Sequence, residues 1–126
     1  MAELSADHDR AHELLRCYVD GSPEALQLAL RIEEKELRGS PDVMWRFFLL
    51  AIRADLTKSQ LAMISAGPFE EFLAAYGDDY FDQLSETARR EQGMRMLLAL
   101  VWRGGVGPAL WDRITALRAA LDILPE

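Results

Sequence analysis

Two copies of one helix-starting pattern constrain the fold of this chain more than any other feature. Gly21-Ser22-Pro23-Glu24 and Gly39-Ser40-Pro41-Asp42 each place a serine before a proline and an acidic residue. Serine caps a helix N-terminus, proline fits the first helical turn, and a carboxylate there interacts favourably with the helix dipole. Each pattern therefore ends one helix and begins the next, which predicts helices that start near Pro23 and Pro41.

The residues around these patterns repeat at helical spacing. The first helix is expected to bury one apolar stripe, made of Ala11, Leu14, Leu15, Tyr18 and Val19. The second helix is expected to bury Ala25, Leu28, Ala29 and Ile32. Its opposite face is expected to carry charged side chains into solvent, namely Glu33, Glu34, Lys35 and Arg38.

Two segments, residues 41–53 and 94–102, are apolar on nearly every side and predict central helices. We expect Trp45 and Trp102, one in each segment, to lie in the core. Met44–Arg53 and Met94–Arg103 both run from Met to Arg over ten residues, which is typical of a repeated helical hairpin. Because any two buried Leu-rich helices look alike, both a short HEAT-like helical-hairpin stack and an irregular bundle remain open.

Glycine and proline divide the rest of the chain into further short helices. Thr57 or Ser59 caps a fourth helix, Gly67-Pro68 breaks it, and a short helix from Pro68 ends near Gly77. Helices over residues 78–90 and from about residue 108 complete the set. No segment alternates with period two and no Asn-Gly or Asp-Gly hairpin turn occurs. The sequence predicts an all-α fold of about seven short helices in a single domain, residues 1–126.

The segment from Ala66 to Leu73, followed by Tyr76-Gly77, resembles a known signature. It is similar to the A-G-P-L-E-D-L-L and H-G motif of a bacterial family of small domains of unknown function. In that family an Ala-Arg step and a closing Val-Trp follow, and Ala88-Arg89 and Val101-Trp102 stand at comparable places. Tyr76 occupies the position where the family often has histidine. The resemblance covers about residues 41–103 and implies no activity, cofactor or partner.

Composition and charge exclude several classes of protein. The net charge of −7, from 14 basic and 21 acidic residues, opposes direct nucleic-acid binding, which needs clustered Lys and Arg. No apolar run is long enough to span a membrane, and Glu3, Asp7 and Asp9 oppose a signal peptide. The one cysteine, Cys17, cannot form an internal disulfide. We expect a cytoplasmic protein that binds neither membranes nor cofactors.

His8 and His12 give the one pattern that resembles a metal site. Histidines at i and i+4 share a helix face and can bind a metal ion together. The chain has no further histidine, so a third ligand would be a carboxylate or Cys17. A small enzyme or metal-binding protein centred on His8 and His12 is therefore the alternative hypothesis.

Other catalytic patterns are missing from the sequence. No Gly-x-Ser-x-Gly occurs, Cys17 has no histidine partner at a recognisable spacing, and Gly104-Gly105-Val106-Gly107 carries no lysine for a phosphate. We therefore expect a protein that is not an enzyme.

The segment between Lys58 and Arg89 contains no basic residue and is rich in carboxylates. Asp78, Asp82 and Glu86 follow i, i+4, i+8 spacing and predict one acidic stripe on a helix. Such a stripe suits a basic partner, although acidic solvated faces are also common. The predicted binding residues are Glu70, Glu71, Asp78, Asp79, Asp82 and Glu86, together with the aromatic residues Tyr80 and Trp111.

The functional hypothesis is a protein-interaction module. Its specific form is a small bacterial inhibitor or immunity-type protein that covers the basic surface of another protein through this acidic helical surface. The sequence leaves the partner and the oligomeric state open.

Overall fold

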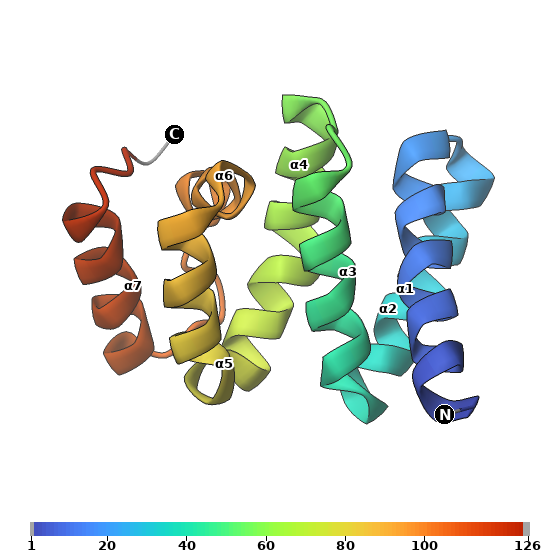
Figure 1. Ribbon diagram of the computed structural model, residues 1–126, viewed down its shortest axis with the longest axis horizontal. Coiled ribbons are helices and arrows are strands. Elements are labelled where there is room, and N and C mark those ends of the chain that lie inside the picture. The colour runs from blue at the N-terminus through green and yellow to red at the C-terminus, as the bar shows by residue number, and fades with distance from the viewer. Residues whose placement is uncertain (1, 125–126) are drawn as a thin grey trace. The chain divides into compact units, whose positions relative to one another are not determined.

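The computed structural model describes the backbone of residues 2–124 and the side chains of residues 9–124. It confirms the all-α prediction, since residues 2–124 contain helices and no strand. The elements are α1 (Ala2–Asp20), α2 (Pro23–Gly39), α3 (Pro41–Arg53), α4 (Lys58–Ile64), the π-helical segment η1 (Ser65–Phe69), α5 (Glu70–Arg90), α6 (Gln92–Leu100) and α7 (Pro108–Ala120) (Figure 1). Because α4, η1 and α5 follow one another without interruption, the described residues form six continuous helical segments rather than about seven.

The predicted helix starts are confirmed at the residues that cap them. The Ser22 hydroxyl accepts a hydrogen bond of 3.1 Å from the Ala25 N–H, and Pro23 is the first residue of α2. Thr57, one of the two predicted caps, forms a capping box with Gln60 at the start of α4. Ser40 precedes α3 without a side-chain cap bond, so Pro41 and the acidic Asp42 mark that start instead.

The chain forms two compact units, Met1–Leu56 and Thr57–Glu126. The first unit contains α1, α2 and α3, and successive helices run in opposite directions (Figure 1). Each of its three helices contacts the other two. Its core holds Leu14 from α1 and Met44, Phe47 and Phe48 from α3, all fully buried. Trp45 also lies in this core, as expected from the all-round apolar character of its helix.

The predicted faces of the first two helices are partly wrong. Glu33 is 4% exposed and Glu36 is 2% exposed, whereas Leu28 and Val19 lie in solvent. The Tyr18 hydroxyl donates a hydrogen bond to Glu33, and Arg10 donates one of 3.0 Å to Glu36. These partners on α1 compensate the burial of two carboxylates, so α2 packs through Ala29, Glu33 and Glu36 instead of its leucines.

In the second unit, the expected break at Gly67-Pro68 is absent. Pro68 lies inside η1, a wider helical turn in which hydrogen bonds span five residues rather than four. Proline has no N–H to donate, and its ring would clash with the carbonyl four residues earlier in an α-helix. The π-helical turn removes that conflict, which allows the chain to continue as a helix into α5.

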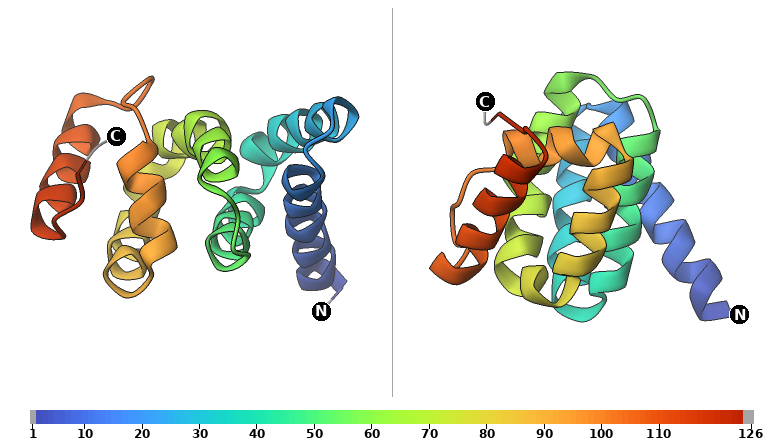
Figure 2. Two further views of the ribbon diagram at one scale, coloured as in Figure 1. Left: turned by 90° about the horizontal axis from the view of Figure 1, so that it is seen from above. Right: turned by 60° about the vertical axis from the view of Figure 1, so that its left-hand side comes forward.

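The α5 helix bends sharply between Phe72 and Tyr80. The centroids of these two rings are 4.9 Å apart, although eight residues of straight helix would separate them by roughly 12 Å. The ribbon accordingly reverses its direction within α5 (Figures 1 and 2). The sequence predicted that one helix ends near Gly77 and another begins at Asp78. The structure has a bend there, within the single helix α5.

The prediction that Trp102 lies in the core is wrong. The α6 helix begins at Gln92 and ends at Leu100, so Trp102 belongs to the following loop and is 72% exposed. The buried face of α6 consists of Met94, Leu97 and Leu98. On α7 the buried apolar residues are Leu110, Ile114 and Leu117, whose i, i+4, i+7 spacing places them on one face.

Candidate functional site

The eight residues predicted to bind a partner all lie in the second unit, seven on α5 and one on α7. The structure divides them by exposure. Five carboxylates are exposed, and we call them the acidic surface: Glu71, Asp78, Asp79, Asp82 and Glu86. Glu70, Tyr80 and Trp111 are half-buried.

Two residues of the acidic surface have nearby cations. Asp78 lies 3.5 Å from the guanidinium of Arg113 on α7, and Glu86 lies 3.6 Å from that of Arg90 one turn later. All four side chains are about half exposed or more, so solvent screens these pairs and each contributes little stability. Within the described residues Asp79 and Asp82 form no ion pair, so the surface keeps most of its negative charge.

Arg113 is held in place by an aromatic ring as well as by charge. Its guanidinium carbon lies 4.0 Å from the ring centroid of Phe81 on α5, which is a cation–π contact. The same side chain reaches Asp78. Phe81 and Asp78 therefore hold Arg113 beside the acidic surface, where its positive charge offsets part of the negative charge.

Tyr80 and Trp111 are engaged within the unit and are less available than expected. The Tyr80 ring packs edge-on against the buried Phe72. Trp111 lies under the guanidinium of Arg118, 4.8 Å from its centroid. Each ring therefore covers a neighbouring side chain of its own unit, Phe72 for Tyr80 and Arg118 for Trp111.

The loop between α6 and α7 lies against the first part of α5. Gly104 has a φ of +49°, and a Cβ at this position would overlap the carboxylate of Glu70. A Cβ at Gly105 would lie 3.7 Å from that of Ala74. Glu70 is thus a neighbour of this loop, and the loop presents Trp102 to solvent beside the start of α5.

Trp102 is the exposed aromatic residue that the sequence reasoning missed. The signal was present, because Arg103-Gly104-Gly105 follows immediately and glycines of this kind end a helix. The apolar run before it masked that signal. Tryptophan is enriched among the residues that dominate protein interfaces, so Trp102 joins the candidate site.

The structure describes the side chain of one of the two predicted metal-binding histidines. His12 lies on α1 and is half-buried, whereas the side chain of His8 lies outside the described residues. Cys17, the suggested third ligand, is buried. Within residues 9–124 no group of three or more His, Cys, Asp or Glu side chains is arranged to hold a metal ion.

No helix in the described part of the chain combines the length and the apolar character that crossing a bilayer requires.

Residues 19–121 match the family described as "Family of unknown function (DUF6869)", which is most of the chain. The chain belongs to the DUF6869 family. No curated protein matches the chain, and no solved structure does. The expected resemblance to a family of unknown function is thereby confirmed.

The DUF6869 match includes the segment from Ala66 to Gly77, and the structure gives this segment a role in the fold. Gly67 and Pro68 lie in η1. Gly77 faces α7, because a Cβ there would lie 2.4 Å from Leu110 Cδ2. These residues shape the course of α5, which in turn determines where the carboxylates of the acidic surface lie.

Proposed function

We propose that this DUF6869 protein is an interaction module that binds a basic surface of another protein in the cytoplasm. The observation that carries the proposal is the acidic surface: five exposed carboxylates of α5, with Glu71 near its start and the other four from Asp78 onward, in a segment that has no basic residue between Lys58 and Arg89. A specific form is an inhibitor or immunity-type protein that covers a basic active-site face of its target.

Charge repulsion within the acidic surface supports this reading. Carboxylates one helical turn apart destabilise a helix by a few tenths of a kcal/mol per pair. Among the residues that the structure describes, ion pairs relieve this at Asp78 and Glu86 alone, and both pairs are exposed. A basic partner would neutralise the remaining charge, so binding would convert repulsion into attraction.

Trp102 supplies the apolar component that an acidic patch lacks. Interfaces gain most of their affinity from a few large side chains, whereas complementary charge mainly accelerates association and selects the partner. An exposed tryptophan on the loop beside the start of α5 provides such an anchor. In this proposal the acidic surface selects the partner and speeds association, and Trp102 contributes most of the affinity.

The proposal is tested by capture of partners from a lysate of the source cell, followed by affinity measurements at two salt concentrations. The charge variant carries Asp79→Lys, Asp82→Lys and Glu86→Lys, which leaves the Asp78–Arg113 pair intact. We expect it to lose a basic protein that the unchanged chain retains. Affinity should also fall steeply with salt, because exposed charges are screened.

The matched control carries Glu13→Lys, Glu24→Lys and Glu34→Lys, three exposed carboxylates of the first unit. It has the same net charge as the test variant and should bind normally. A Trp102→Ala variant should bind more weakly with little change in salt dependence. Equal loss of binding in both charge variants, or an affinity that salt does not alter, would contradict the proposal.

A further inference from the structure

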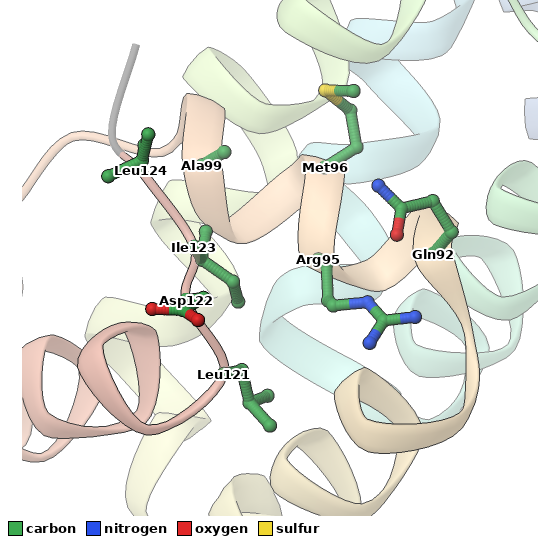
Figure 3. A pocket seen from close by; sticks show the side chains of 8 residues that line it. All are labelled: Gln92, Arg95, Met96, Ala99, Leu121, Asp122, Ile123 and Leu124. Carbon is green, nitrogen blue, oxygen red and sulfur yellow. The ribbon is translucent and has the colours of Figure 1, made fainter.

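A cavity of about 350 Å³ lies within the second unit, between the outer face of α6 and the segment that follows α7. Its α6 wall consists of residues at i, i+3, i+4 and i+7, which share one side of the helix: Gln92, Arg95, Met96 and Ala99. The other wall is formed by residues 121–124 (Figure 3). The cavity is separate from the acidic surface, and the proposed function does not use it.

Arg95 is the unusual member of this lining. Its Nε is buried and has no hydrogen-bond partner among the described residues. A buried donor on a charged group is costly when it stays unsatisfied. Arg118, in the same unit, shows the ordinary solution, because its guanidinium donates to the carbonyl oxygens of Leu98 and Val101. The buried Nε is itself closed to the cavity, but the terminal nitrogens of the Arg95 guanidinium are not buried and form no hydrogen bond among the described residues, so they can donate to a ligand.

Residues 121–124, which form the other wall, follow the C-terminal end of α7 in a regular backbone turn. Asp122 adopts a left-handed conformation with a φ of +55°, and the Ile123 N–H donates a 2.8 Å hydrogen bond to the Arg118 carbonyl. This is the Schellman ending of a helix, and it holds residues 121–123 against the unit. Arg95 extends away from Asp122 (Figure 3), and no ion pair between them occurs in the described part of the chain. Asp122 consequently does not neutralise the guanidinium.

We propose that this cavity binds a small organic carboxylate. The ligand's carboxylate would accept hydrogen bonds from the Arg95 guanidinium, whose planar fork matches two carboxylate oxygens, with Gln92 beside it as a further donor. Its apolar chain would lie against Met96, Ala99, Leu121 and Ile123. The volume is at the small end of the range for ligand pockets, which favours an acid with a short chain over a larger cofactor.

The test is an NMR titration of the isotope-labelled full chain with three probes. Hexanoate carries the carboxylate and a short apolar chain, hexanamide keeps the shape without the charge, and inorganic phosphate keeps the charge without the chain. We expect saturable shifts with hexanoate alone, confined to residues 92–99 and 121–124. Saturation by hexanamide at the same concentration would overturn the proposal, as would hexanoate shifts located on other basic residues.

Three variants connect the binding to the cavity. Arg95→Met should weaken hexanoate binding at least tenfold, and Arg89→Met, the same change at an exposed position on α5, should leave it unaltered. Ala99→Phe fills part of the cavity while Arg95 is kept, and it should also abolish binding. If Arg95→Met does not fold, Ala99→Phe still decides the matter. Unchanged affinity in a folded Ala99→Phe protein would refute the assignment.

Discussion

Arg118 on α7 donates two hydrogen bonds, of 2.9 and 2.6 Å, to the carbonyl oxygen of Leu98 on α6. A third bond of 2.6 Å reaches the carbonyl of Val101, just past the end of α6. The last carbonyls of a helix lack partners within the helix, and a cation there also interacts favourably with the helix dipole. Burial lowers the pKa of Arg118 from its ordinary value. This side chain therefore ends α6 and fastens α7 to it.

We predict that Arg118→Met strongly destabilises the protein. The substitution would leave two buried carbonyl groups without their donor, which should reduce the free energy of unfolding by about 2–4 kcal/mol. Urea denaturation followed by circular dichroism measures this change. Arg113→Met, which removes an exposed arginine from the same helix, should cost less than about 1 kcal/mol. Similar losses in the two variants would show that capping of α6 is unimportant.

Two glycines should respond to the same substitution with opposite signs. A Cβ at Gly67 meets no atom within 4 Å, so Gly67→Ala should stabilise the protein by about 0.5–1 kcal/mol through reduced freedom of the unfolded chain. A Cβ at Gly77 would lie 2.4 Å from Leu110 Cδ2, and Leu110 is itself buried. Gly77→Ala should therefore destabilise by about 1–3 kcal/mol. Thermal unfolding of both variants is the measurement, and a stabilising Gly77→Ala would show that α5 and α7 are not in close contact.

The hydrogen bond between Tyr18 and Glu33 should matter for stability. Tyr18→Phe keeps the ring, which stacks on Phe47 at 5.6 Å, and removes the donor to a buried carboxylate. We expect the free energy of unfolding to fall by about 1–3 kcal/mol in chemical denaturation. Glu34→Gln, at a neighbouring exposed position paired with Arg38, should change it by less than about 0.5 kcal/mol. A Tyr18→Phe protein as stable as the unchanged chain would contradict the contribution assigned to this bond.

Cys17 should be a slow nucleophile in the folded protein. Burial raises the pKa of its thiol above the ordinary 9.0, and the carboxylates of Glu13, Asp20 and Glu33 raise it further. Only the thiolate reacts with iodoacetamide, so alkylation of the native protein should be about 100-fold slower than that of the unfolded chain at pH 8. Mass spectrometry follows the reaction, and equal rates in the two states would contradict the prediction.

The raised pKa of the Cys17 thiol also makes the free energy of unfolding depend on pH. The folded state retains the thiol proton while the unfolded chain releases it. The contribution of Cys17 is therefore fully present below the ordinary thiol pKa and is lost as the pH rises above it. Cys17→Ala should remove this part of the alkaline loss of stability.

Local chemistry explains which parts of the fold could be predicted. Ser22, Thr57 and Pro23 act within one helical turn, so the sequence alone was enough to place the starts of α2 and α4. The buried line of α7 follows from its spacing in the same way. Five of the six carboxylates singled out on α5 are exposed and Glu70 is half-buried, because charge favours solvent unless a partner compensates its burial.

The wrong predictions depended on contacts between distant residues. Glu33 is buried because of Tyr18, fifteen residues earlier, and no periodic pattern contains that information. The exposure of Trp102 depends on where α6 ends, and Arg118 supports that ending from another helix. The cavity beside Arg95 is formed by two segments more than twenty residues apart, so no local pattern of residues could indicate it.

The buried carboxylates of α2 also limit the ways in which the first unit can assemble. A helix that packs through leucines can slide along its neighbour by one turn and still find apolar contacts. If α2 slid along α1, Glu33 would leave Tyr18 and Glu36 would leave Arg10, and two buried charges would lose their partners at a cost of several kcal/mol. The correct alignment of these helices is therefore selected by the penalty on every competing alignment, rather than by unusually strong attraction in the native one.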